Sequence, residues 1–102
     1  MPEYRLPIRV YIEDTDAGGI VYYVNYLKYF ERARTELIRS LGVDKTAVME
    51  DGSVFVVTSA SINYHAPARL DDQLESVAEV VSSGAATIEF RQSVVRSGVE
   101  LA

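Results

Sequence analysis

The sequence predicts an α+β fold in which one long helix packs on an antiparallel sheet. Apolar and polar residues alternate in several segments, a single segment has helical periodicity, and short turns separate the later alternating segments. The predicted order is a strand, the helix and at least three further strands, without a repeat or a linker. We therefore expect residues 1–102 to form a single domain.

The first strand is predicted over residues 6–13. Ile8, Val10 and Ile12 alternate there with more polar neighbours, which is the period of a strand with one buried face. Pro7 fits the beginning of such a strand or the edge of a sheet, where its missing amide costs no pairing.

A long amphipathic helix is predicted after this strand. Asn25 can cap its first turn, because the side chain can accept a hydrogen bond from an unpaired amide. Gly42 can adopt the left-handed conformation that ends a helix. The apolar residues at helical spacing, which we expect to face the core, are Tyr26, Phe30, Ala33, Leu37 and Leu41.

Three more strands are predicted downstream of the helix. Residues 54–64 begin as a continuous apolar run and continue in alternation, which indicates a long strand with its first half buried on both faces. Residues 73–81 and 86–94 alternate as well. Residues 43–53 are mixed in character and predict a connection with room for one helical turn. Turns are predicted at residues 71–72, 82–84 and 97–98.

The composition argues against several classes of function. The formal net charge is -5, and the ten basic residues are scattered, so no nucleic-acid surface is expected. The absence of cysteine excludes disulfides and thiolate chemistry and fits a reducing cytoplasm. No signal peptide and no apolar run of membrane-spanning length is present, so we expect a soluble cytoplasmic protein. A chain of 102 residues has a marginal core, which favours self-association.

The loop of residues 13–25 joins the first strand to the helix and carries two acids, Asp14 and Asp16. A metal pair is disfavoured because no further ligand lies at ligand spacing. Two interpretations remain open. Both acids can be loop residues that hydrogen-bond the turn. Alternatively, one carboxylate acts on a carbonyl that the amides of the helix N-terminus polarise, an arrangement that suits acyl transfer or hydrolysis.

Other catalytic arrangements lack support in the sequence. The single histidine, His65, has no evident partner, and a lone histidine is more often structural or exposed. None of the serines lies in a G-x-S-x-G pattern, and the glycine pair in the loop is not a phosphate-binding motif. The tyrosines around the helix start are interpreted as aromatic packing, with one or two near a pocket.

Two separated motifs resemble a known family. Residues 14–22 (DTDAGGIVY), followed by residues 30–34 (FERAR), form the first, and residues 64–72 (YHAPARLDD) form the second. Together they resemble the hotdog-fold acyl-CoA thioesterases, in particular the 4-hydroxybenzoyl-CoA thioesterase family and its subgroup associated with the Tol-Pal system. The resemblance covers nearly the whole chain and implies a long helix wrapped by an antiparallel sheet.

The resemblance also implies roles for individual residues. Asp16 would be the catalytic carboxylate, as nucleophile or as general base, and Asp14 would be structural. The backbone amide of Tyr23 would polarise the thioester oxygen. Family sites usually lie between two subunits, so Thr58 of a partner would complete the pocket. No cofactor or metal is implied. The residues expected to bind substrate are Gly19, Val21, Tyr23, Asn25 and Thr58.

Three features depart from the family pattern. Tol-Pal-associated members commonly carry a histidine at the position of Tyr23, whereas the 4-hydroxybenzoyl type carries tyrosine there. Relatives often have a basic residue in the turn where this chain has residues 83–86 (SGAA), so CoA phosphates would be held weakly or by Arg91 or Arg96. The family fold adds a strand after the turn at residues 97–98, so we expect either a truncated sequence or a sheet that is one strand short.

The leading hypothesis is a cytoplasmic thioesterase that hydrolyses small acyl-CoA thioesters and assembles as a homodimer or homotetramer. The alternative is a non-catalytic hotdog module that binds an acyl carrier or a protein partner, which the missing basic turn and the missing strand would fit. A hotdog dehydratase or hydratase ranks lower, because such sites generally rely on a histidine and His65 lies outside the acidic motif.

Overall fold

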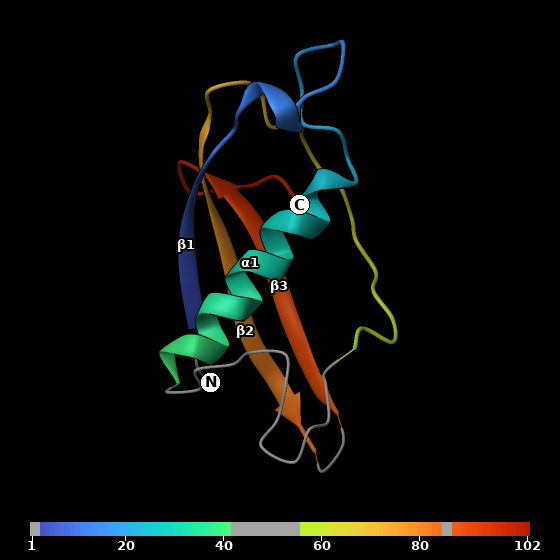
Figure 1. Cartoon of the computed structure of the whole chain (residues 1–102), viewed down its shortest axis with the longest axis vertical. Coiled ribbons are helices and arrows are strands. Elements are labelled where there is room, and N and C mark those ends of the chain that lie inside the picture. The colour runs from blue at the N-terminus through green and yellow to red at the C-terminus, as the bar shows by residue number, and fades with distance from the viewer. Residues whose placement is uncertain (1–2, 42–55, 85–86) are drawn as a thin grey trace.

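The computed structural model describes residues 3–41, 56–84 and 87–102. One long helix lies across a four-stranded antiparallel sheet with the strand order β1-β2-β3-β4 (Figure 1). The α+β fold predicted from the sequence is confirmed. The elements are β1 (Glu3–Arg9), the short 3-10 helix η1 (Ile12–Asp14), α1 (Asn25–Ser40), β2 (Gln73–Ser83), β3 (Ile88–Arg96) and β4 (Val99–Glu100).

Strand β1 begins and ends earlier than predicted. Among the described strands it pairs only with β2, and it places Pro7 opposite Glu75, which agrees with an edge position for this proline. The predicted continuation to residue 13 is wrong, because the chain turns into η1. The amide of Asp14 donates to the carbonyl of Tyr11, and its carboxylate accepts from the amide of Tyr11, so these groups are used in a turn instead of a ladder. Ile12 is consequently exposed.

Helix α1 buries the side that its periodicity predicts. Four of the five expected core residues are buried, whereas Leu41, just after the helix, is exposed. Tyr29 joins the buried face, with 1% of its surface exposed. The predicted Asn25 cap is wrong. Asn25 is the first helical residue, and its side-chain amide donates to the carbonyl of Asp14 at 2.8 Å. The predicted stop at Gly42 lies outside the described residues.

The inner face of the sheet packs on α1 to form the core. On β2, Leu74, Ser76 and Ala78 point to this face and are buried. The hydroxyl of Ser76 donates to the carbonyl of Tyr29 at 2.8 Å, which satisfies a polar group inside the core. Core clusters of apolar side chains therefore join the sheet to the helix.

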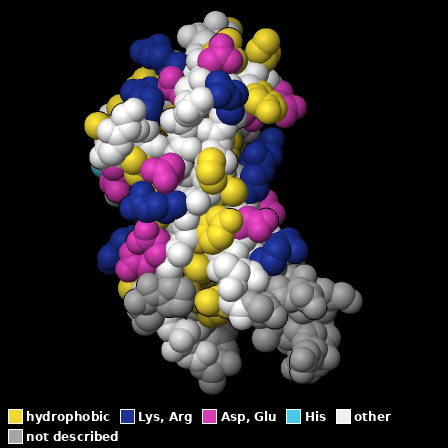
Figure 2. All heavy atoms as spheres, turned by 90° about the vertical axis from the view of Figure 1, so that its left-hand side faces the viewer, with side chains coloured by type: hydrophobic (Ala, Val, Ile, Leu, Met, Phe, Trp, Pro, Cys, Tyr) yellow, Lys and Arg dark blue, Asp and Glu magenta, His cyan; other side chains and the backbone are white. Residues whose placement is uncertain are grey.

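The side of the molecule around β1 carries mixed charge. Arg5 forms ion pairs with Glu3 at 2.9 Å and with Glu75 at 3.6 Å, all three side chains being well exposed. Figure 2 shows acidic and basic side chains interspersed with apolar ones on this side. Basic residues do not gather there into the continuous patch that binding to a phosphate backbone requires.

The predicted strand over residues 54–64 is wrong for the part that the structure describes. Residues 56–64 are extended but form no strand, and Val56 and Val57 are 73% and 68% exposed. In Figure 1 this segment runs at the opposite side of the view from β1. Alternating apolar residues give a segment the capacity to pair, but a strand also needs a neighbour for its backbone groups. Within the described sheet no such neighbour faces this segment.

The last two hairpins lie close to their predicted positions. Strand β2 continues two residues beyond the predicted end, and its pairing with β3 shifts register between Val80 and Ser82. The predicted turn at residues 97–98 is confirmed, with φ of 51° at Ser97 and 80° at Gly98. Positive φ at both central residues is the geometry that joins two antiparallel strands tightly. Strand β4 follows this turn. None of the described helices is long and apolar enough to cross a membrane.

Candidate active site

A tight hairpin presents the acidic motif. Thr15 and Val21 form an isolated antiparallel bridge, and the amide of Asp16 donates to the carbonyl of Ile20 at 3.0 Å. The turn closes when the amide of Gly19 donates to the carbonyl of Asp16 at 3.1 Å. Gly19 has a φ of 75°, a conformation that residues with a side chain rarely adopt. The glycine thus allows the reversal that displays Asp16.

The carboxylate of Asp16 is exposed at this turn. Its Oδ1 accepts a hydrogen bond from the amide of Gly18 at 2.9 Å, which holds the side chain in one orientation. A Cβ at Gly18 would lie 3.3 Å from that oxygen, closer than most side chains approach, so glycine permits the contact. No other described residue hydrogen-bonds this carboxylate. The remaining lone pairs are therefore open to a water molecule or a substrate.

Asp14 is used inside the protein instead. It is 8% exposed, and its Oδ2 accepts from the amide of Tyr11 at 3.0 Å. Its carbonyl accepts both from the amide of Tyr22 at 3.0 Å and from the side chain of Asn25 at 2.8 Å. These bonds tie the acidic loop to the first turn of α1. The two acids of the motif thus occupy opposite environments.

The hydroxyl of Tyr29 lies close to Asp14. It is fully buried and has no hydrogen-bond partner of ordinary geometry among the described residues. Burial raises the pKa of Tyr29 well above its usual range, and the negative charge of Asp14 raises it further. The tyrosine therefore stays protonated as a neutral phenol beside the Asp14 carboxylate. The sequence predicted aromatic packing for the tyrosines around the helix start, with one or two near a pocket, and did not indicate this contact with Asp14.

The start of α1 offers free amides. The carbonyl of Tyr22 accepts from the amide of Asn25 at 2.8 Å, and the carbonyl of Tyr23 accepts from the amide of Tyr26 at 3.3 Å. The amides of Tyr23 and Val24 donate to no residue that the structure describes. Such unpaired amides at a helix N-terminus carry partial positive charge. They can stabilise negative charge that develops on a carbonyl oxygen.

The second sequence motif is fastened to the first. The amide of Val21 donates to the carbonyl of Ala68 at 2.8 Å, and the amide of Ala68 donates to the hydroxyl of Tyr26 at 3.0 Å. The amide of Leu70 donates to the carbonyl of Gly19 at 3.2 Å. Motifs that are about fifty residues apart along the chain therefore meet at the helix start.

Tyrosine rings cover this end of the molecule. The ring centroids of Tyr22 and Tyr23 lie 5.1 Å apart, and Tyr64 contacts Tyr23 at 6.0 Å and Tyr26 at 5.4 Å. These separations are typical of favourable aromatic pairs. The hydroxyl of Tyr64 donates to the carbonyl of Tyr23 at 3.1 Å. The sequence predicted the aromatic packing but not this hydrogen bond, whose only signal was the position of Tyr64 at the start of the second motif.

The other predicted substrate-binding residues have different surroundings. Val21 is 4% exposed and belongs to the core, and Asn25 is partly buried and bonded to Asp14. Thr58 is exposed in the extended segment, and no described hydrogen bond or strand pairing joins it to the acidic loop. Four of the predicted residues, at positions 19, 21, 23 and 25, thus lie in the acidic loop and at the helix start, whereas no described hydrogen bond joins Thr58 to them.

The arginines proposed for phosphate binding also differ. Arg96 donates to the carboxylate of Asp72 at 2.6 Å and to the carbonyl of Pro67 at 3.4 Å, so it is engaged within the protein. Partial burial raises the pKa of Asp72, but the hydrogen bonds from the Arg69 amide and from Arg96 outweigh it and hold the pKa below its usual value. Arg91 is exposed on β3.

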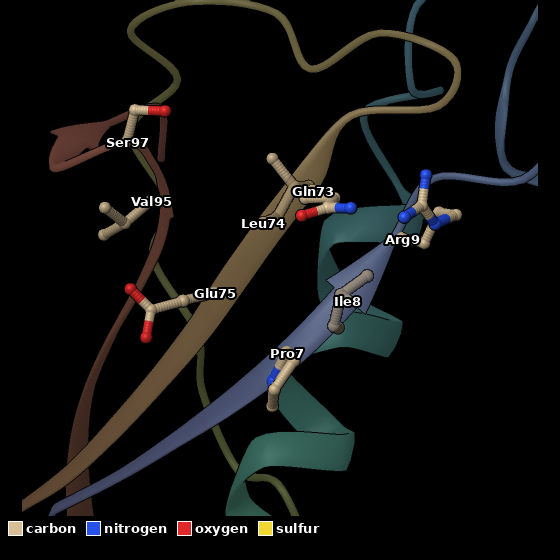
Figure 3. A pocket seen from close by; sticks show the side chains of 8 residues that line it. All are labelled: Pro7, Ile8, Arg9, Gln73, Leu74, Glu75, Val95 and Ser97. Carbon is tan, nitrogen blue, oxygen red and sulfur yellow. The ribbon is translucent and has the colours of Figure 1, made fainter.

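A groove among the described residues lies away from the motif. It is an open groove of about 480 Å³ along β1, β2 and β3 (Figure 3). Neither this groove nor a second hollow of about 340 Å³ beside α1 is lined by a residue of the acidic loop. The described residues also contain no group of three or more acids or histidines placed to hold a metal ion. The residues that line the groove are Pro7, Ile8, Arg9, Gln73, Leu74, Glu75, Val95 and Ser97.

A long helix on an antiparallel sheet, with an acidic hairpin beside the helix N-terminus, defines a hotdog-fold protein. Residues 18–102 match the family model described as the Thioesterase superfamily. The chain belongs to this superfamily, and the resemblance stated from the sequence is confirmed.

Individual relatives are similar over most of the chain. The chain is 45% identical over 94 residues to the acyl-CoA thioester hydrolase YbgC of Escherichia coli O6:H1, covering 92% of this chain and 70% of the relative. It is 44% identical over 99 residues to the acyl-CoA thioesterase YbgC of Haemophilus influenzae, covering 96% and 73%. A crystal structure of a probable thioesterase from Bartonella henselae superimposes with a TM-score of 0.86 at 31% identity, covering 99% of this chain and 82% of that one. The predicted class, a thioesterase, is therefore confirmed.

Proposed function

We propose that the protein hydrolyses small acyl-CoA thioesters with Asp16 as its catalytic carboxylate. The observation that carries the proposal is the exposed Asp16 carboxylate in a hairpin that leads directly to the free amides at the start of α1. The names of the relatives, acyl-CoA thioester hydrolase and acyl-CoA thioesterase, support the substrate class.

The chemistry follows from what each group can do. The thioester carbonyl carbon is attacked either by the Asp16 carboxylate or by a water that Asp16 deprotonates. Negative charge then develops on the carbonyl oxygen, and the amide of Tyr23 donates a hydrogen bond to it. Cleavage of the C–S bond releases the thiol of CoA, which takes up a proton, and water supplies the hydroxyl of the product acid. If Asp16 attacks directly, that water cleaves the acyl-aspartyl anhydride in a second step.

We also propose that the working enzyme is a homodimer or a pair of such dimers. Residues 56–64 pair with no strand of the described sheet, and residues 56–61 at the start of this segment are exposed. Pairing of this segment with its copy in a second subunit would satisfy its backbone and cover Val56 and Val57. Thr58 of the partner subunit would then line the substrate site.

The test is a hydrolysis assay with acetyl-, hexanoyl- and benzoyl-CoA. The rate is measured from the appearance of the free thiol of CoA. Asp16→Asn should lower kcat by about 1,000-fold, because an amide can neither attack the carbonyl nor accept a proton from water. The asparagine oxygen can still accept the hydrogen bond from the Gly18 amide. The hairpin should therefore persist, and the thermal unfolding midpoint should not change.

Glu13→Gln is the matched control, because Glu13 is an exposed acid in the same loop. It should keep the parent's kcat. An Asp16→Asn variant that is folded and turns over as fast as the parent would exclude Asp16 as the catalytic group. A parent that binds these thioesters without hydrolysing any of them would support the non-catalytic module instead.

A further inference from the structure

The peptide group between Tyr23 and Val24 is held by two donors. Its carbonyl oxygen accepts from the hydroxyl of Tyr64 at 3.1 Å and from the amide of Tyr26 at 3.3 Å. Because a peptide group is planar and trans, fixing the carbonyl of Tyr23 also fixes the direction of the Val24 amide on the opposite side. That amide donates to no described residue.

The neighbouring peptide group is held differently. The carbonyl of Tyr22, which belongs to the same peptide as the Tyr23 amide, accepts only from the backbone of Asn25 among the described residues. The Tyr23 amide is therefore oriented by the local turn alone. The Val24 amide is oriented in addition by a side chain that arrives from a segment 41 residues away.

We propose that Tyr64 is a positioning residue for thioester hydrolysis. Its hydroxyl orients and polarises the Tyr23–Val24 peptide, so that the Val24 amide serves as a second oxyanion donor beside the Tyr23 amide. This inference rests on the proposed thioesterase function. Two donors aimed at one oxygen stabilise an oxyanion better than one, provided that neither has to reorganise during the reaction.

The surroundings of Tyr64 suit this role. Its ring packs against Tyr26 and Tyr23, and the chain just after it is anchored by the amides of His65 and Ala66, which donate to the carbonyl of Leu101 at 2.9 and 3.3 Å. The hydroxyl is thus delivered from a fixed segment. Desolvation, and then the neighbouring tyrosines, raise the pKa of Tyr64, so the hydroxyl keeps its proton as a donor at neutral pH. A hydrogen bond accepted by a carbonyl strengthens the amide of the same peptide as a donor.

The test is Tyr64→Phe in the full chain, which removes the hydroxyl and keeps the ring. With benzoyl-CoA and hexanoyl-CoA, kcat should fall by about 10-fold, and KM should stay within about 2-fold, because the lost stabilisation belongs to the transition state. The thermal midpoint should be unchanged. In a ¹H–¹⁵N correlation spectrum, the Val24 amide resonance should shift more than that of Tyr23.

Tyr4→Phe is the control, because it removes a phenol hydroxyl from β1, where Tyr4 packs beside the cluster of Ala33 and Leu37. It should keep the parent's kcat. The inference is overturned if Tyr64→Phe keeps the parent's kcat, if it raises KM instead, or if kcat falls while the Val24 resonance stays in place. The two proposals can fail separately. An active Asp16→Asn variant contradicts the role of Asp16 as the catalytic carboxylate. If Asp16→Asn is inactive and Tyr64→Phe is fully active, only the role of Tyr64 is contradicted.

Discussion

The acidic loop of residues 13–25 and the extended segment of residues 56–64 both carry predicted site residues, yet the protein holds them in opposite ways. The loop is bonded to η1, to α1 and to the second motif, and Asp14 at its base is buried. Residues 56–61 of the segment, which include Thr58, are exposed and pair with no described strand, whereas Tyr64 at its end bonds to the carbonyl of Tyr23. One half of the candidate site is therefore organised within a single chain. The other half has the composition of a strand but lacks the neighbour that would make it one.

The most direct test of this difference is the Val57→Glu variant. Val57 is 68% exposed in the single chain, so a charge there should cost little unless a second subunit covers it. In the proposed dimer the carboxylate would be buried without a partner, and we expect dissociation to monomers with about a 100-fold loss of activity. Light scattering after size exclusion and the thioester assay measure the two effects.

Ile88→Glu is the control for this change, because Ile88 is also exposed but lies at the start of β3 in the described sheet. It should keep the parent's mass and activity. A Val57→Glu variant that stays dimeric and active would place the subunit contact elsewhere and would remove Thr58 from the site.

The loop half should instead respond in stability. Asp14→Ala removes the acceptor of the Tyr11 amide and the charge that faces the Tyr29 hydroxyl. Leaving a part-buried donor without a partner should lower the free energy of unfolding by about 2 kcal/mol. Urea denaturation measures this change. Glu13→Ala, an exposed neighbour, should stay within about 0.5 kcal/mol of the parent. Equal losses for both variants would mean that the burial of Asp14 contributes nothing.

The same contrast separates what sequence can predict from what it cannot. Helix α1 and the hairpin at residues 97–98 were predicted because their signals, apolar spacing and turn residues, lie within the segments themselves. Residues 56–64 carry the pattern of a strand, but pairing depends on a neighbour that no local pattern specifies. Asn25 fits a cap by type, and it donates to the loop because the carbonyl of Asp14 happens to lie within reach.

In the candidate site, too, some features could be predicted from the sequence and others could not. The different roles expected for Asp14 and Asp16 came from the resemblance of the motif to a known family. Their spacing alone did not distinguish the two acids, because either could be a turn residue. Their environments, one buried and one exposed, arise from the turn at η1, which the alternating pattern did not reveal. The bond from Tyr64 to the carbonyl of Tyr23 joins residues 41 positions apart, and no periodicity can indicate such a contact.

A smaller effect concerns the anchor of the second motif. Asp72 accepts hydrogen bonds from the Arg69 amide at 2.8 Å and from Arg96 at 2.6 Å, and its pKa lies below the ordinary value of 3.8. Because the folded pKa is lower than the unfolded one, this carboxylate stabilises the fold above pH 3.8, and the contribution is lost as the pH falls through the folded value. Asp72→Asn should therefore lower the free energy of unfolding by about 1 kcal/mol at pH 7 and by progressively less in acid.

Unfolding by urea at a series of pH values measures this difference. Asp71→Asn is the control, because Asp71 is exposed and has a φ of 68°, a conformation that asparagine tolerates. A gap between the Asp72→Asn variant and the parent that stays constant down to acid pH would show that the charge of Asp72 is not what stabilises this anchor.

The smallest effect is expected at a residue that enters the proposed chemistry through its backbone alone. In the proposal Tyr23 acts through its backbone amide. The residue is 58% exposed, and its ring packs against the rings of Tyr22 and Tyr64. Tyr23→Phe keeps the amide and the ring, so kcat/KM should stay within about 2-fold of the parent, whereas Tyr64→Phe should lose about 10-fold. Measured in one assay, the pair separates a hydroxyl that orients the backbone from one that does not. A loss at Tyr23→Phe as large as that at Tyr64→Phe would mean that the Tyr23 hydroxyl itself contributes to catalysis, which contradicts the proposal that Tyr23 acts through its backbone amide alone.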